Sequence, residues 1–140
     1  QGSASITKVD NTTSSATPHA QSFRMTDAVG GDTGFGIVAS SDSTPSAFVA
    51  NQYAVGSLIP SGSGSGELDY STMTIRSVAS NTQFDLVRSL ANNSGATVTI
   101  YALALYQGSS ATHMLARNVP TAFAVADGAT AVIKFSLSIT

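Results

Sequence analysis

Residues 131–139 read AVIKFSLSI, and apolar and polar side chains alternate along the whole stretch. The positions that share the apolar face are Ile133, Phe135, Leu137 and Ile139. Successive side chains of a β-strand leave opposite faces of the pleat, so a period of two over nine residues predicts a strand with one buried face. The chain is therefore expected to be built from sheet.

Similar strand patterns recur along the C-terminal half, separated by short turn segments. The candidate strands are 35–39, 70–78, 83–90, 97–107, 113–119, 121–126 and 130–140, with a further start at 23–25. Regularly spaced strands with turn residues between them are typical of antiparallel sandwiches and barrels, and no run shows sustained helical periodicity. We therefore expect an all-β fold. It would be a single antiparallel β-sandwich, jelly-roll-like, over residues 23–140, with an extended N-terminal arm over residues 1–22.

Two glycine-containing segments need an interpretation of their own within this outline. Gly36 interrupts the strand at 35–39 and indicates a bulge or a close backbone approach. The stretch SGSGSG at 61–66 has the composition of a flexible linker. Because the residues before it hold too few strands for a core of their own, it is expected to be an exposed loop within one domain.

Residues 98–106, VTIYALALY, are apolar on both faces. Such a strand is either central and covered on both sides or part of a subunit contact. Tyr101 and Leu103 are therefore candidate contact residues.

The composition favours contact between copies of this chain. Of 140 residues, 42% are hydrophobic and only 10% charged, and the net charge is −2 without a basic cluster. We do not expect the chain to bind nucleic acid, because such binding depends on clustered cationic side chains. Few charges would need desolvation when another copy docks, so self-association is expected. No apolar run reaches the roughly 18 residues of a membrane span.

The N-terminal arm, residues 1–22, is polar and has little apolar surface to bury. One interpretation is a loosely attached terminus or a peripheral edge strand. The other is a strand that adds to the sheet of a neighbouring subunit, with Ala4, Ile6 and Val9 as candidate contact residues. Because the chain begins with Gln1 rather than Met, we expect that a signal peptide, a propeptide or a tag was removed.

A set of short motifs follows in a fixed order along residues 34–140. They are Gly36-Ile-Val38, Tyr53-Ala-Val-Gly-Ser-Leu-Ile59, Gly62-Ser-Gly-Ser-Gly-Glu-Leu-Asp-Tyr70, Asn92-Asn-Ser-Gly-Ala-Thr-Val98, Leu105-Tyr106, Leu115-Ala-Arg-Asn-Val119, Val125-Ala-Asp-Gly128 and Phe135-Ser-Leu-Ser-Ile139. This order resembles a group of small β-rich structural proteins encoded in tailed-phage and prophage genomes. The group usually has an acidic pair where this chain has Asn51 and Gln52. The resemblance implies a virion structural protein, with no catalytic residues to transfer.

Catalytic chemistry finds little support in the residues. The two histidines are His19 and His113. A relay would need His113 to meet one of many serines and an acid such as Asp85 or Asp127, and no nucleophile-elbow pattern accompanies it. We expect no enzymatic activity and no cofactor.

Several polar residues are considered as calcium ligands, glycosylation sites or contact residues. Oxygen ligands for calcium could converge from Asp27, Asp32, Asp42, Glu67 and Asp69, although their spacing matches no known calcium loop and such residues usually bond to their own turns. Asn11 and Asn92 fit the glycosylation pattern. Arginines interrupt three strand-like runs, at 76, 88 and 117, and are expected to face solvent or to fix a contact between subunits.

The first functional hypothesis is a self-assembling subunit of a virus particle, such as a capsid decoration or tail protein, with other virion proteins as further partners. The second is a secreted filament or tube subunit assembled by strand addition, so the expected location is virion or extracellular. The third is a glycan-binding module, which the absence of Trp weakens.

Overall fold

The computed structural model describes residues 4–7, 13–16, 28–45, 54–77, 83–108 and 112–138. Within these residues the fold is all-β with antiparallel pairing and no helix, which confirms the expected fold class. The strands are β1 (Ala4–Thr7), β2 (Thr13–Ala16), β3 (Gly36–Ser40), β4 (Asp69–Tyr70), β5 (Thr74–Ser77), β6 (Gln83–Ala91), β7 (Val98–Ile100), β8 (Ala102–Gly108), β9 (Thr112–Asn118), β10 (Phe123–Val125) and β11 (Thr130–Ser138).

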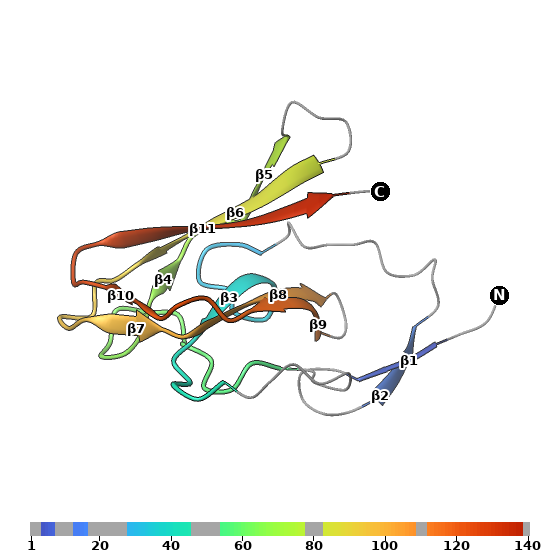
Figure 1. The fold of residues 1–140 in the computed structure, drawn as a ribbon, viewed down its shortest axis with the longest axis horizontal. Coiled ribbons are helices and arrows are strands. Elements are labelled where there is room, and N and C mark those ends of the chain that lie inside the picture. Colours follow the sequence, from blue (N-terminus) through green and yellow to red (C-terminus); the bar gives the residue numbers. More distant parts are fainter. Residues whose placement is uncertain are drawn as a thin grey trace.

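The C-terminal half forms one long antiparallel ribbon that is folded over on itself (Figure 1). Strand β6 pairs with β11 over nine residues, from Gln83 opposite Ser138 to Ala91 opposite Thr130. Beyond the fold, β7 pairs with β10 and β8 pairs with β9. The earlier strands extend the two halves of this ribbon. Strand β3 joins the edge of β8, while β4 and β5 join the edge of β6.

The hydrophobic core draws side chains from both halves of the ribbon. Ile37 on β3 and Leu105 on β8 share one cluster of buried residues with Leu86 on β6 and Ile133 on β11. A second, smaller cluster covers the opposite side of β3 and β8 and contains Val38, Val55, Ala104 and Tyr106. Strand β8 is therefore covered on both faces, as its two apolar faces predict. Leu103 is 6% exposed and packs into the larger cluster of its own chain.

The final strand has the faces that its alternation predicts. Ile133 is buried at 8% exposure, Phe135 and Leu137 are half-buried against the core, and Val132 on the other face is 65% exposed. Two expected strands are interrupted instead of continuous. The strand at 70–78 breaks between β4 and β5, where the Met73 N–H donates to the Ala28 carbonyl. The strand at 97–107 breaks at Tyr101, whose N–H donates to the Ser40 carbonyl.

Both glycine segments are ordered by specific contacts. Gly36 has φ of +70°, and a Cβ there would lie 2.6 Å from Cγ of Met73. The group that comes close to Gly36 is therefore the Met73 side chain, whereas the sequence predicted a bulge or a close approach of backbone. In the Gly-rich turn at 62–67, the Gly64 N–H donates to the Glu67 carboxylate over 2.8 Å. The turn folds around this side chain.

The arm contributes a hairpin in which β1 and β2 pair with each other, from Ala4 opposite Ala16 to Thr7 opposite Thr13. Neither strand pairs with another described strand. Ala4 and Ile6 lie on β1, whereas Val9 and the expected strand start at 23–25 lie outside the described residues.

Candidate functional site

Three of the five predicted calcium residues accept hydrogen bonds from their own turns. Asp32 accepts the Gly34 N–H over 2.8 Å, and Asp42 accepts the Thr44 N–H over 3.0 Å. Glu67 caps the Gly-rich turn, Asp69 is exposed at the start of β4, and Asp27 lies outside the described residues. No group of three His, Cys, Asp or Glu side chains comes together in the described part of the chain. The interpretation of Asp32 and Asp42 as turn residues is confirmed.

Arg88 corrects the sequence analysis, because its side chain is not solvent-facing. It is 1% exposed and lies on the core side of β6, with Leu86 and Leu90. All five N–H groups of the guanidinium donate to backbone carbonyls. The acceptors are Ser71 at 2.7 Å, Val29 at 3.1 Å, Asp32 at 2.6 Å, Phe35 at 3.1 Å and Ile37 at 2.9 Å.

This arrangement satisfies a buried cation without an ion pair. Full use of the five donors offsets much of the cost of removing a guanidinium from water. The guanidinium carbon also lies 4.9 Å from the centre of the Tyr70 ring, within the range of a cation–π contact. Burial lowers the pKa of Arg88 from its ordinary value, and the nearby Tyr70 and Asp32 act in the opposite direction. Arg88 thereby joins the loop before β3 and the end of β4 to the middle of β6.

Asn92 fits the glycosylation pattern, but its side-chain amide is not available to a glycan in this fold. The residue is fully buried at the fold of the ribbon. Its amide nitrogen donates to the Ala96 and Val125 carbonyls, both at 2.7 Å, and its amide oxygen accepts the Ser94 N–H. Asn92 therefore holds the corner between β6 and β7. The other pattern match, Asn11, lies outside the described residues.

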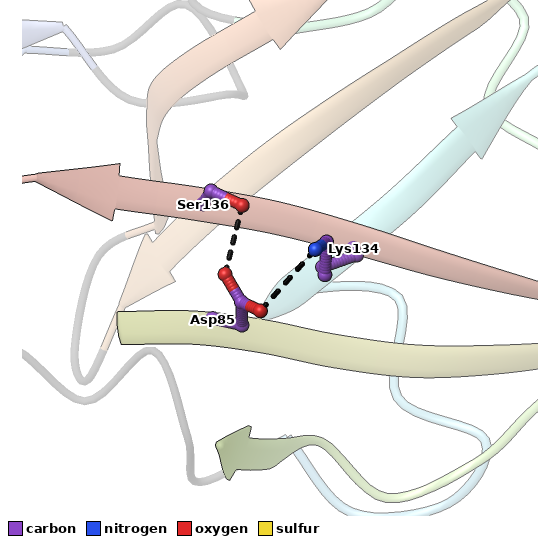
Figure 2. Close-up of polar contacts among 3 residues, drawn as sticks. All are labelled: Asp85, Lys134 and Ser136. Carbon is purple, nitrogen blue, oxygen red and sulfur yellow. Dashed lines mark hydrogen bonds and ion pairs between the residues drawn. The ribbon is translucent and has the colours of Figure 1, made fainter. Parts of the chain in front are cut away.

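A polar cluster joins β6 to β11 on the face away from the core (Figure 2). The Ser136 hydroxyl donates to Asp85 over 2.8 Å, and the Lys134 ammonium lies 3.3 Å from the other carboxylate oxygen. Asp85 is 11% exposed at its side chain and Lys134 is 59% exposed. The ammonium and the hydroxyl thus contact the two oxygens of one carboxylate. The cluster cross-links two strands.

The two acids that a relay with His113 would need both have other partners. Asp85 holds Ser136 and Lys134, and Asp127 accepts the Gly95 N–H over 2.9 Å in the turn before β7. His113 lies on β9, opposite Gln107 of β8, and His19 lies outside the described residues.

One edge of β11 is a candidate surface for contact with another chain. Strand β11 pairs with β6 and with no other described strand, so its second edge of N–H and C=O groups has no described ladder partner. Natural proteins usually protect such edges with charges, prolines, bulges or short strands. Over nine residues β11 has no proline, a regular register and one charge, Lys134, which already faces Asp85. We regard this edge as the candidate functional site.

The edges of β3, β5 and β9 are better protected. Strand β5 has four residues, and β9 has an irregular register beside Leu115. The free side of β3 is partly covered, because the Ile59 N–H donates to Ala39 and the Ser41 N–H to Ser57. Large apolar side chains stand exposed on three of the edge strands: Ile75 at 56%, Leu115 at 41% and Val132 at 65%. Exposed apolar groups at sheet edges favour contact with other chains.

In comparisons with known proteins, no family model, no curated protein and no solved structure matches the chain. In the part of the chain that the structure describes, no helix is long and apolar enough to cross a membrane.

Of the contact residues predicted in the strand at 97–107, Tyr101 is half-buried between β7 and β8 and Leu103 is in the core.

Proposed function

We propose that this chain is a non-enzymatic structural subunit that assembles with copies of itself as part of a virus particle, in the manner of a capsid decoration or tail protein. The observation that carries the proposal is the long edge of β11, which has no partner among the described strands. An open edge gains a full ladder of backbone hydrogen bonds when another strand joins it. The low charge of the chain reduces the desolvation cost of that contact.

We also propose that the architecture is a jelly-roll-like β-sandwich. A jelly roll can be described as a long antiparallel ribbon folded into two facing sheets. The pairing of β6, β7 and β8 with β11, β10 and β9, together with a core shared by both halves, supports this assignment. The resemblance of residues 34–140 to phage-encoded structural proteins is the support for a virion rather than another assembly.

Absence of catalysis is part of the proposal and rests on how the polar side chains are used. Asp32, Asp42, Glu67 and Asp127 cap turns, and the Asp85 cluster joins two strands. Tyr70 and Tyr106, which might otherwise form a sugar-stacking surface, are 0% and 3% exposed. These uses favour a structural role over a glycan-binding one.

Analytical ultracentrifugation of the full chain tests the proposal, with Val132→Lys as the variant and Ser65→Lys in the exposed Gly-rich turn as the control. The wild type and the control are expected to sediment as concentration-dependent oligomers. Val132→Lys should shift the distribution toward monomer, because a second charge on the edge opposes strand addition. A wild type that stays monomeric at high concentration contradicts the proposal. Electron micrographs of the native material then separate a virion part from a secreted filament, which would use the same edge.

A further inference from the structure

We propose that two copies join through β11, antiparallel, across a two-fold axis that passes at Phe135. The sheet containing β11, β6, β4 and β5 would then continue from one subunit into the next. This inference rests on the proposed function, since it names the contact through which self-assembly begins.

The symmetry of the contact restricts which registers are possible. In a two-fold contact the same surface meets itself, so if one residue faces a second, the second also faces the first. Residues directly opposed in an antiparallel pair point to the same side of the sheet. The apolar side of β11, with Ile133, Phe135 and Leu137, must therefore face the apolar side of its copy. This condition requires an axis that passes at a residue of the strand.

Charge distinguishes the registers centred near the middle of β11. An axis at Lys134 would set two ammonium groups directly opposite each other, which is unfavourable. An axis at Ile133 would set Lys134 opposite the partner's Val132, which offers no acceptor. An axis at Phe135 sets Lys134 opposite the partner's Ser136.

The register centred on Phe135 uses the polar cluster in both subunits. Ser136 donates to Asp85 within each chain, so an ammonium placed opposite the partner's Ser136 also approaches the partner's Asp85. Lys134 is 59% exposed and its long side chain can reach across the contact. Each carboxylate would then lie between two ammonium groups, one from each chain, and the arrangement occurs twice by symmetry.

The same register covers the half-buried apolar side of the edge. Phe135 would meet the partner's Phe135, and Ile133 would meet the partner's Leu137. Phe135 and Leu137 are half-buried in the single chain, so they have further surface to remove from water. On the opposite face, the exposed Val132 would lie opposite the partner's Ser138.

Disulfide scanning of the full chain tests the register directly, because the protein contains no cysteine. A mass-tagged Val132→Cys chain is mixed with one of three untagged variants, Lys134→Cys, Ser136→Cys or Ser138→Cys, and oxidised mildly. All four positions are exposed on one face of β11, so folding should be little affected. Directly opposed Cβ atoms are about 4.5–5.5 Å apart and diagonal ones about 7–8 Å, while a disulfide needs about 3.5–4.5 Å.

We expect the mixed disulfide to form several-fold more with Ser138→Cys than with the other two. A maximum with Ser136→Cys would place the axis at Lys134, and a maximum with Lys134→Cys would place it at Ile133; either result overturns the register. If an oligomer persists but no pair forms a disulfide above the level of a Ser65→Cys control, β11 is not the interface and the inference fails alone. If the wild type is monomeric, the proposed function fails with it.

Discussion

Arg88 shows how one buried residue can organise distant segments of a sheet protein. Its five donors hold carbonyls of Val29, Asp32, Phe35, Ile37 and Ser71, which belong to the loop before β3, to β3 itself and to the segment after β4. The guanidinium supplies a donor to each of these carbonyls, and the Val29 carbonyl also accepts the Asp32 N–H over 3.2 Å. The side chain therefore acts much as a structural metal would, by collecting backbone oxygens from several segments around one charge.

Replacing Arg88 with Met should lower the free energy of unfolding by about 3–5 kcal/mol, because several buried carbonyls would lose their donors. Arg88→Lys should be only partly better, since an ammonium has three donors in place of five. Asp69→Asn, at an exposed position, serves as the control and should change stability by less than ~0.5 kcal/mol. Urea denaturation measures all three. A small effect of Arg88→Met would show that the loop carbonyls find other donors.

Tyr70 should make the fold sensitive to alkaline pH. Burial raises the pKa of Tyr70 to about 12, although the Ala39 N–H and the Arg88 charge act to lower it. Below pH 10 the hydroxyl is protonated in both the folded and the unfolded chain, and the stability it contributes is fully present. As pH rises through 12, the unfolded chain has released a proton that the folded chain retains, and roughly 3 kcal/mol of stability is lost.

Thermal melting between pH 8 and 12 measures this loss, with Tyr70→Phe as the comparison. The variant loses the hydrogen bond from the Tyr70 hydroxyl to the Ile59 carbonyl, at 2.9 Å, and should be about 1 kcal/mol less stable at neutral pH. Its melting temperature should nevertheless fall less steeply with pH. Some slope remains, because burial also raises the pKa of Tyr106. Identical slopes in the two proteins would contradict the assignment to Tyr70.

At the scale of strands, the local sequence pattern predicted which face of a strand is buried. It failed for side chains whose partners lie far away in the sequence. The alternation in β11 correctly placed Ile133 inside and Val132 outside, and the apolar run in β8 correctly indicated cover on both faces. Arg88 occupies the same face of β6 as Leu86 and Leu90, because alternate residues of a strand share a face. This spacing was the one feature of the sequence that indicated an inward side chain. Its acceptors, however, lie 17 to 59 residues away in the sequence, and no pattern along β6 reveals them.

The candidate site could be predicted only in part for the same reason. A half-buried strand has the same alternation whether it lies at the edge or in the middle of a sheet, so AVIKFSLSI could not reveal that β11 is an edge. That property depends on β4 and β5, which occupy the other side of β6. The partners of Asp85 were hidden likewise, because the register that brings Ser136 opposite Asp85 is set by the whole ribbon. The strand breaks at Tyr101 and between β4 and β5 also follow from bonds to distant carbonyls.

At the scale of the molecule, a two-fold contact through β11 closes on itself and produces a dimer. A particle or a filament needs a second kind of contact. The N-terminal arm is the segment best suited to supply it, because β1 and β2 pair only with each other among the described strands and each leaves an outer edge open.

Deletion of residues 1–22 should therefore stop assembly at the dimer while leaving the rest of the chain folded. We expect cooperative melting with little change in the midpoint, an unchanged β-sheet circular dichroism signal and a sedimentation coefficient limited to that of two copies. Val132→Lys in the full chain is the matched comparison, because it should weaken the β11 contact and leave the arm intact. Particles that still form without the arm would exclude it as the second contact. A deletion variant that fails to fold would instead make the hairpin an integral part of its own subunit.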